Sequence, residues 1–443
     1  MGKTHRFYYG WVVVAVSFVT LFLTLGTRFS FGVFYVAILK EYDWGRAQTA
    51  GAFSLGLMVH AFFSIVTGKL IDRFGPRTLF PLGAIFLTIG LAFASLINAV
   101  WHLYVLFGVV LALGINTLAY APHMSLIPRW FIRKRGLAGG LVIAGTGLGT
   151  LTMAPLIQFA IDNVGWRSSF LVLAGIIIGV VVPLTALFQR NSPRDVGQFP
   201  DGIEPPAREI HTVGPMAFGK NPQFTGTSAQ WTLKAALFTR AFWWLGLANF
   251  TVGFTNNMLV LHQAAHVVDA GYTPSLAASI VGLVGLLRSG GGILLGLLSD
   301  RMGREIAYSF GSSAALVGIL FLLLVRNTTS LWMLYAFVIL FGFGFGSVGP
   351  IFAATTADLF PGNWLGRIMG TFSIGWGIGG ALGAYLGGYF CDHLGNYTLP
   401  FVLAMISIIL GVIGVWIAAP RHRQASSPLK GLRNPEETPS SSQ

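Results

Sequence analysis

The sequence predicts an all-α integral membrane protein in which twelve transmembrane helices form two pseudo-symmetric six-helix bundles. Three observations support this fold class: an apolar composition, apolar runs that recur along the chain, and a loop motif that occurs twice. Of the 443 residues, 54% are hydrophobic and only 10% are charged, whereas soluble domains carry roughly 25% charged residues. The mean hydropathy of +0.70 is typical of a chain whose main solvent is lipid.

The recurring apolar runs are long enough to cross roughly 30 Å of hydrocarbon. The first run is too long for the apolar core of a cleavable signal peptide, which has about 7–15 residues, so we expect it to be a membrane span. The twelve expected spans are residues 11–36, 47–71, 78–98, 101–127, 136–161, 168–188, 241–266, 275–299, 307–325, 330–357, 366–389 and 397–419.

The spacing of these spans predicts four regions. The only long polar connection, rich in proline and glycine, separates the sixth span from the seventh, and we expect it to be mobile. The polar segment after the last span is expected to be disordered. The regions are an N-terminal six-helix bundle (residues 1–190), a cytoplasmic linker (191–240), a C-terminal six-helix bundle (241–420) and a cytoplasmic tail (421–443).

The formal net charge of +13 has two possible explanations, a nucleic-acid partner or the positive-inside bias of membrane proteins. Twelve spans place both termini on one side, and most Lys and Arg residues fall in the loops of that side. We therefore expect a multi-pass protein of the cell membrane, with no nucleic-acid partner and with both termini in the cytoplasm. The opposite loops contain only Lys40, Arg46, Arg167 and Arg326.

The doubled motif is G-x-L-x-D-R-x-G, which occurs at Gly68–Gly75 after the second span and at Gly296–Gly303 after the eighth. Carboxylates and guanidinium groups at these positions can bond to neighbouring helix ends. We expect them to form a cytoplasmic gate that holds neighbouring helices in one state and releases them in the other; the alternative is that they are solvated turn charges. The gate candidates are Asp72, Arg73, Arg77, Asp300, Arg301 and Arg304.

The doubled motif, the twelve spans and the long central loop resemble the major facilitator superfamily over roughly residues 8–420. This resemblance implies two bundles that rock around a central site lined by the first, fourth, seventh and tenth spans. A narrower resemblance, to bacterial members of the monocarboxylate and oxalate/formate carrier group, rests on short motifs in three regions. They are Tyr8-Tyr-Gly-Trp11, Asn191-Ser-Pro-Arg-Asp-Val-Gly197 with Pro200-Asp-Gly202, and Arg288 in span 8.

One position departs from that narrower pattern. Eukaryotic members of the group carry an aspartate four residues before the span 8 arginine, and this chain has Val284 there. A proton-coupling role for that acid therefore does not transfer to this protein.

Arginines, but no acids, are expected inside the membrane. All fifteen Asp and Glu residues fall in loops, the linker, the tail or at helix ends, whereas Arg288 lies near the centre of span 8 and Arg28 in the outer half of span 1. A charge in mid-membrane costs at least about 2.5–3.5 kcal/mol, and an anion from outside can offset this cost. Because a guanidinium group forms two parallel hydrogen bonds to a carboxylate, we expect Arg288 to bind a small carboxylate.

Each arginine has an alternative role. Arg288 could be structural and bond to backbone carbonyls of a helix broken at Ser289–Gly292. Arg28 could extend toward the outer interface. Other polar residues could complete the binding site or simply hydrogen-bond between helices. They are Asn116 and Tyr120, expected on one face of span 4, Asn256 in span 7 and Tyr335 in span 10.

Three histidines, His262, His123 and His60, are candidates for carrying a coupled proton, because imidazole titrates near neutral pH. The alternatives are that they pack as neutral side chains, or that the proton travels on the substrate carboxylate.

The resulting hypothesis is a monomeric secondary active transporter that moves a monocarboxylate such as lactate or pyruvate by alternating access, with proton symport. Alternatives are an anion exchanger of the oxalate/formate type, an exporter of a drug or metabolite, and, from a different class, a transporter-like membrane sensor. We expect no enzymatic activity, metal or cofactor, because the chain lacks nucleotide-binding, metal-ligand and hydrolase motifs. The G-x-G-x-x-G pattern at Gly344–Gly349 lies inside an apolar span, where it favours close helix packing.

Overall fold

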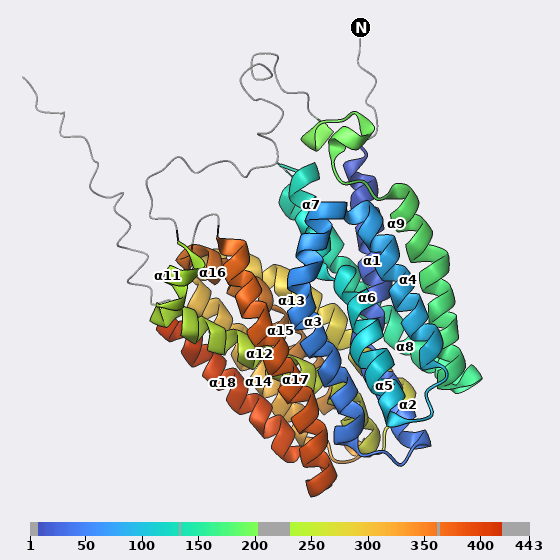
Figure 1. Cartoon of the computed structure of the whole chain (residues 1–443). Helices are drawn as coiled ribbons and strands as arrows, with labels where there is room; N and C mark the ends of the chain where they lie inside the picture. The colour runs from blue at the N-terminus through green and yellow to red at the C-terminus, as the bar shows by residue number, and fades with distance from the viewer. Residues whose placement is uncertain (1–7, 133, 203–230, 361–363, 419–443) are drawn as a thin grey trace, which may run out of the picture.

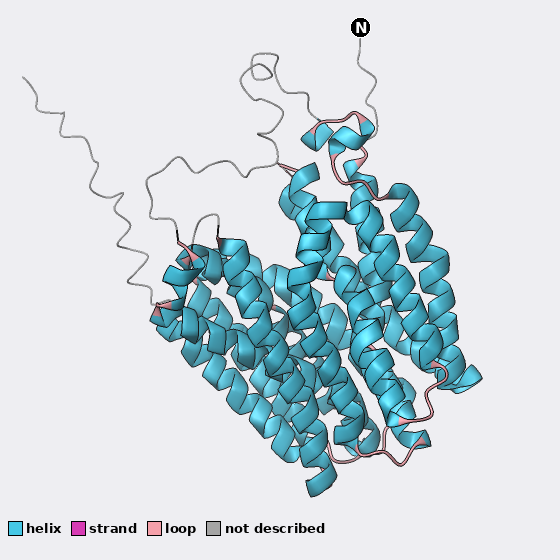
Figure 2. Cartoon of the chain, in the orientation of Figure 1, coloured by secondary structure: helices cyan, strands magenta, loops and turns pink. Residues whose placement is uncertain are grey.

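The computed structural model describes residues 8–132, 134–202, 231–360 and 364–418, without the side chains of Asp72, Arg135 and Asp300. Every regular element in these residues is a helix (Figure 2). The helices form two bundles that lie side by side, one from the blue-to-green N-terminal half and one from the yellow-to-red C-terminal half (Figure 1). The predicted fold class is therefore confirmed. The tail at 421–443 and residues 203–230 of the expected linker lie outside the described residues.

The N-terminal bundle contains six spans. Gly165, at φ 77° and ψ 159°, separates the fifth span from the sixth within α8. In order, the spans are α1 (Gly10–Phe29) with α2 (Phe31–Glu41); α3 (Arg46–Phe74); α4 (Pro76–Ala94); α5 (Val100–Leu103), η1 (Tyr104–Leu111), α6 (Ala112–Thr117) and α7 (Tyr120–Trp130); the first part of α8 (Arg135–Ile176); and the rest of α8 with η2 (Ile177–Val181) and α9 (Val182–Phe188).

The C-terminal bundle contains the other six spans. Two short turns, η3 (Pro193–Val196) and η4 (Pro200–Gly202), follow the N-terminal bundle, and α11 (Leu233–Leu237) precedes the C-terminal one. The spans are α12 (Arg240–Asp269), α13 (Pro274–Met302), α14 (Arg304–Leu324), η6 (Thr328–Ser330) and α15 (Leu331–Gly346) with α16 (Val348–Leu359), α17 (Leu365–Leu394) and α18 (Thr398–Ala418).

Length and hydropathy alone identify nine segments of the described chain as able to cross a membrane. One of them, Gly136–Phe188, holds two spans. The expected spans that this criterion omits are α12, which carries two adjacent asparagines and two histidines, and the glycine-rich α17. Both helices are long enough to cross the bilayer and pack among the other spans, so polar and small residues lower their hydropathy without removing them from the membrane.

The doubled motif forms the same turn in both bundles. Gly75, at φ 75°, joins α3 to α4, and Gly303, at φ 94°, joins α13 to α14. Only glycine adopts such a backbone readily, which explains why both copies end in glycine. We call the side of the molecule that holds these turns the linker side (top of Figure 1), and the opposite side, where α2 ends and α3 begins, the far side.

Glycines allow helices within each bundle to approach closely. A Cβ atom at Gly149 of α8 would lie 2.2 Å from the carbonyl oxygen of Phe22 in α1, and one at Gly379 of α17 would lie 2.1 Å from that of Phe250 in α12. Gly344 of α15 is equally close to α14. These contacts confirm that the glycine patterns in the apolar spans serve helix packing.

Two sequence motifs meet at the linker side of the N-terminal bundle. The hydroxyl of Tyr8 donates to the carbonyl of Trp130 and accepts a hydrogen bond of 3.1 Å from the backbone N–H of Asp201. The N–H of Tyr9 donates to the side chain of Gln198 at 2.9 Å. Burial raises the pKa of Tyr8 to about 12. The start of the expected linker is therefore docked on the N-terminal bundle.

Candidate functional site

Three of the predicted site residues lie at the same height in the molecule. At a rise of about 1.5 Å per residue, Arg28, Asn256 and Arg288 each lie about 20 Å from the far-side end of their span. Asn116 lies slightly nearer the linker side. These residues come from four spans, so the fold places them in one layer near the middle of the bundles.

Arg288 lies at the boundary between the two bundles. Its guanidinium carbon is 5.8 Å from the ring centre of Phe29 in α1 and 5.2 Å from that of Phe345 in α15. No residue in the described part of the chain forms a hydrogen bond or ion pair with this guanidinium. The N–H donors of Arg288 therefore have no acceptor within the described residues.

The alternative structural role of Arg288 required a broken helix. Instead, α13 is continuous from Pro274 to Met302 and passes through Ser289–Gly292 as regular helix. The backbone carbonyls of that stretch are therefore available for helical bonds and do not converge on the arginine. This geometry leaves Arg288 in the middle of a span with no ion-pair partner in the part of the chain that the structure describes.

The described carboxylates lie away from this layer. Each one whose side chain is described sits in a loop or near the end of a helix, as the sequence predicted. The examples within helices are Glu41, Asp162, Asp269, Glu305, Asp358 and Asp392.

Arg28 faces the interior of the N-terminal bundle. It lines a cavity together with His60 of α3. The amide nitrogen of Asn116 donates to the carbonyl of His60 at 2.7 Å and lies 3.2 Å from its Nδ1 atom. The tertiary structure thus joins Asn116 to His60, a pairing that the sequence did not predict.

The prediction that Asn116 and Tyr120 share one helix face is wrong. Helix α6 ends at Thr117, Ala119 has an extended backbone at φ −74° and ψ 176°, and α7 begins at Tyr120. This interruption changes the direction of the side chains that follow it. Tyr120 is exposed and lies about 30 Å from the far-side end of its span.

Asn256 has a buried amide with an unusual environment. Its side chain is 1% exposed, and neither the amide nitrogen nor the amide oxygen has a hydrogen-bond partner among the described residues. An unsatisfied buried polar group costs about 1–3 kcal/mol.

Two of the three histidines predicted as candidate proton carriers, His123 and His262, differ in their surroundings. His123 is fully buried beside Phe80, with ring centres 4.4 Å apart, and neither of its nitrogens has a partner in the described structure. His262 is also fully buried, but its Nε2 lies 2.8 Å from the carbonyl of Ala384 and its Nδ1 lies 3.3 Å from the hydroxyl of Tyr397. Because a carbonyl only accepts, the Nε2 atom carries a proton, and Nδ1 accepts from Tyr397 in the neutral ring.

Tyr335 lies apart from the central layer. It is one turn into α15, about 6 Å from the far-side end of that helix, and is 43% exposed. Phe345, which contacts Arg288, lies about 15 Å further along the same helix. The structure therefore does not bring Tyr335 to Arg288.

The gate candidates have contacts within their own bundles. The Nε atom of Arg304 bonds to Asp358 of α16 at 3.1 Å and its Nη1 atom to Ser299 of α13 at 2.7 Å. The backbone N–H of Arg77 donates to Asn191 at 3.2 Å. Arg73 and Arg301 are exposed, and the side chains of Asp72 and Asp300 lie outside the described structure.

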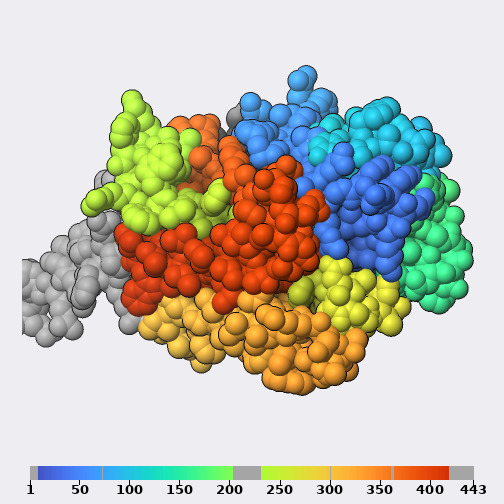
Figure 3. Space-filling model, turned by 90° about the horizontal axis from the view of Figure 1, so that it is seen from below, coloured from blue at the N-terminus to red at the C-terminus, as the bar shows by residue number. Residues whose placement is uncertain are grey.

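On the far side, Arg46 joins the two bundles, a role that the sequence did not predict. Its guanidinium contacts Asp269 of α12 at 2.8 Å and the Tyr397 hydroxyl at 2.7 Å, while its backbone N–H donates to Asp392 of α17 at 2.9 Å. Two further hydrogen bonds between the bundles, Ser54 to Ala381 and Ser275 to Asp162, lie in the same half of the molecule. Figure 3 shows the far side as a closed surface across the boundary.

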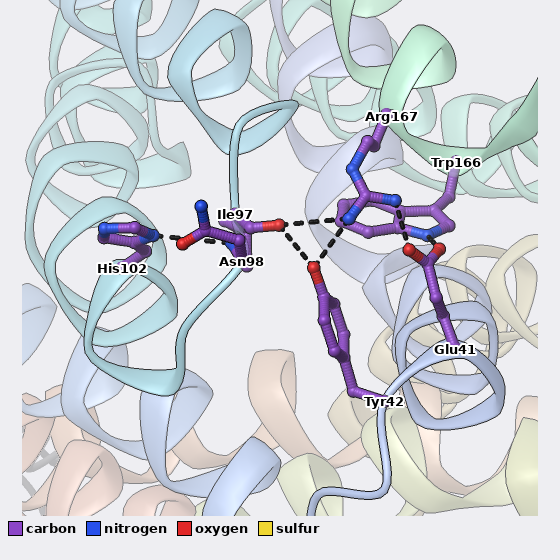
Figure 4. Close-up of polar contacts among 7 residues, drawn as sticks. All are labelled: Glu41, Tyr42, Ile97, Asn98, His102, Trp166 and Arg167. Atoms are coloured by element: carbon purple, nitrogen blue, oxygen red, sulfur yellow. Dashed lines mark hydrogen bonds and ion pairs between the residues drawn. The ribbon is translucent and has the colours of Figure 1, made fainter.

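A second polar cluster holds the far-side end of the N-terminal bundle together (Figure 4). Glu41 accepts hydrogen bonds from the indole of Trp166 and from Arg167. Arg167 also donates to the Tyr42 hydroxyl at 2.6 Å and to the carbonyl of Ile97 at 3.3 Å. The beginning of the sixth span is thereby tied to the end of the first span and to the loop after the third.

Comparison with known proteins agrees with this architecture. The sequence model of the Major Facilitator Superfamily matches residues 17–384 and 329–440. A bacterial homolog of the human lysosomal transporter Spinster, in an inward-facing and unoccupied conformation, has the same fold, with a TM-score of 0.68 at 18% identity over 94% of this chain and 96% of that one. This chain belongs to the Major Facilitator Superfamily and is a membrane transporter.

Two relatives are similar over nearly the whole chain. Monocarboxylate transporter 13 of Bos taurus is 28% identical over 428 residues, which cover 95% of this chain and 91% of the relative. Monocarboxylate transporter 11 of Homo sapiens is 27% identical over 427 residues, which cover 95% and 85% of the two chains.

Proposed function

We propose that this transporter is a secondary carrier that moves a small monocarboxylate, of the lactate or pyruvate type, by alternating access. The observation that carries the proposal is Arg288, a guanidinium at the boundary of the bundles with no acceptor among the described residues. A carboxylate matches its two parallel donors. The names of the relatives support the same substrate class.

In this proposal the carboxylate binds Arg288, and the unsatisfied amide of Asn256 supplies a further hydrogen bond. Arg28 lies at the same height as Arg288, on the opposite side of α1. Asn116 hydrogen-bonds to His60, which lines the same cavity as Arg28. Tyr120 lies toward the linker side and Tyr335 toward the far side. Binding neutralises Arg288, which allows the bundles to rock around the site.

The linker side is the cytoplasmic side in this proposal, because most Lys and Arg residues gather there. The contacts of Arg46 then close the outer side, and the structure corresponds to an inward-facing state. The motif loops around Asp72 and Asp300 form the cytoplasmic gate when the bundles rock the other way, with Arg73, Arg77, Arg301 and Arg304 as their basic partners.

Proton symport is the proposed mode of coupling, with His262 as the proton acceptor. Its Nδ1 atom faces the Tyr397 hydroxyl, which bonds to Arg46, which in turn bonds to Asp269 at the far-side surface. These contacts connect the buried imidazole to the far-side surface, with Arg46 donating to both Tyr397 and Asp269. His123 is the second candidate, since its ring lacks partners among the described residues. Anion exchange is the alternative mode.

The test is uptake of labelled pyruvate and lactate into proteoliposomes with an imposed pH gradient. Arg288→Gln should reduce uptake at least tenfold, because it removes the charge that binds the carboxylate. Arg326→Gln, the same change in a far-side loop, is the control and should leave uptake unchanged. Equal uptake by the wild type and Arg288→Gln would refute the site. Uptake that responds to internal oxalate, and not to the proton gradient, would establish exchange.

A further inference from the structure

The N-terminal bundle holds a cavity that is separate from the Arg288 position. Phe29 on one side of α1 contacts Arg288, whereas Arg28 and Thr24 of the same helix line the cavity on the other side. All of the lining residues come from the N-terminal bundle. The walls include five aromatic rings, those of Phe31, Phe34, Phe53, Phe107 and Phe170.

The polar side chains that line this cavity are those of Thr24, Thr27, Arg28 and His60. The hydroxyls of Thr24 and Thr27 already donate to backbone carbonyls of their own helix, each at 2.7 Å. Arg28 makes no hydrogen bond or ion pair with any residue that the structure describes. Its guanidinium is therefore available to a ligand that brings its own acceptors.

Asn116 determines which nitrogen of His60 carries the proton. The amide nitrogen of Asn116 can only donate, and it lies 2.7 Å from the His60 carbonyl and 3.2 Å from Nδ1. Nδ1 is consequently an acceptor, and the ring proton is on Nε2. Asn116 itself is 2% exposed, so it does not compete for the ligand. The other ring nitrogen of His60, Nε2, is therefore the one available to a ligand in the cavity, and it is a hydrogen-bond donor.

We propose that this cavity selects the substrate, and that the carrier prefers carboxylates with an aromatic or other large apolar body. The cavity is a second carboxylate subsite, apart from the Arg288 position: in it Arg28 and the Nε2–H group of His60 hold the carboxylate, and the phenylalanine walls enclose the apolar body. Asn116 is a positioning residue that acts through His60. A carboxylate matches the guanidinium of Arg28 and the Nε2–H group of His60, and apolar walls favour an apolar body. This proposal rests on the proposed carboxylate transport and names the substrate class within it.

Pyruvate and phenylpyruvate provide a matched pair of ligands, because they differ only in one phenyl group. Burying that group in an apolar cavity should strengthen binding about tenfold or more. The measurement is displacement of labelled phenylpyruvate from the purified full-length protein by each acid. Equal affinity of the wild type for the two acids would overturn the proposal.

Two His60 variants separate the donor role from a packing role. His60→Gln places an amide N–H near the position of Nε2 and should keep phenylpyruvate affinity within about threefold. His60→Asn places its amide near the position of Nδ1 and should lower that affinity about tenfold. Equal losses in both variants would overturn the assignment of Nε2 as a donor to the carboxylate.

Two Ile→Phe variants test whether the walls of the cavity enclose the apolar body of the substrate. Ile115→Phe puts a larger side chain into the lining and should abolish the preference for phenylpyruvate over pyruvate. Ile89→Phe makes the same change at an exposed position of α4 and should leave the preference intact. An unchanged preference in Ile115→Phe would contradict the site.

The two proposals fail in different ways. If neither acid is transported by the wild type, or if Arg288→Gln transports both normally, carboxylate transport through Arg288 is wrong. If pyruvate uptake depends on Arg288 but phenylpyruvate has no advantage, only the cavity proposal is wrong.

Discussion

Asp392 in the C-terminal bundle caps the helix that Arg46 begins in the N-terminal bundle. Its two carboxylate oxygens accept the backbone N–H groups of Arg46 at 2.9 Å and of Ala47 at 2.8 Å. The first N–H groups of a helix have no partner within it, so α3 obtains its cap from the opposite bundle. The guanidinium of Arg46 extends the same contact to Asp269 and Tyr397. Opening the far side requires all of these bonds to separate.

Asp392→Asn should favour the state in which the far side is open. The substitution removes the charge that stabilises the helix N-terminus and weakens the cap by about 1 kcal/mol, which is about a fivefold change in the equilibrium. The measurement is the distance between spin labels at Lys40 and Asn396, both exposed on the far side, in a Cys391→Ala background.

Asp43→Asn is the control for this experiment, because Asp43 is exposed on the same side and makes no hydrogen bond within the described residues. It should leave the distance distribution as in the parent protein. A distribution that is also unchanged in Asp392→Asn would show that the cap does not hold the far side closed.

Glu41→Gln should destabilise the N-terminal bundle without changing the balance between states. Glu41 binds Trp166 and Arg167, which belong to the same bundle (Figure 4). The ion pair is about 40% exposed, so its loss should cost only about 1 kcal/mol and lower Tm by about 2–4 °C. Thermal unfolding in detergent, with Asp43→Asn as the matched acid-to-amide control, measures the effect. An altered spin-label distance with no change in Tm would contradict this assignment.

Gly147→Val should impair transport more than stability. A Cβ atom at Gly147 would lie 2.1 Å from the hydroxyl of Ser289 and 3.0 Å from the carbonyl of Gly285, both in α13 of the opposite bundle. The larger side chain therefore prevents the approach of the bundles seen here. Gly140→Val on the same helix meets nothing within 4 Å and is the control. Wild-type transport by Gly147→Val would mean that the bundles need not approach so closely.

His262→Gln should uncouple substrate movement from the proton gradient. The glutamine amide can still donate to the carbonyl of Ala384, which His262 Nε2 contacts at 2.8 Å, but it does not titrate near neutral pH. Uphill pyruvate uptake driven by pH should be lost, while exchange of labelled for unlabelled pyruvate continues. His393→Gln, at an exposed position, is the control. Continued accumulation by His262→Gln would assign the proton to another group.

The number and order of the spans could be predicted because lipid imposes a strong local constraint. Backbone groups in hydrocarbon must bond within their own helix, so all of the spans except the more polar α12 and the glycine-rich α17 show in their own hydropathy. The doubled motif also reports local backbone geometry, since Gly75 and Gly303 both need positive φ. The break at Ala119 was not predicted, because it interrupts an apolar run without a glycine or proline at that position.

The partners of the polar residues could not be predicted from the same patterns. Asn116 and His60 are 56 residues apart in the chain, and Arg46 and Asp392 are 346 apart. Hydropathy predicts the depth of a residue in the membrane. It does not predict the rotation of its helix or which helix packs against it. The sequence therefore predicts His60 only as a candidate proton carrier and Arg46 only as a loop charge.

By itself, the sequence determined the twelve-span architecture, the relation between its halves and the presence of arginines without acids at mid-height, since each of these follows from local composition and spacing. The tertiary structure alone decided that Arg28 and Arg288 lie on opposite sides of α1, that Asn116 orients His60, and that Asp392 caps α3. The physical reason is that the rotation of each helix, and which helices it packs against, depend on the packing of all the spans in the bundle.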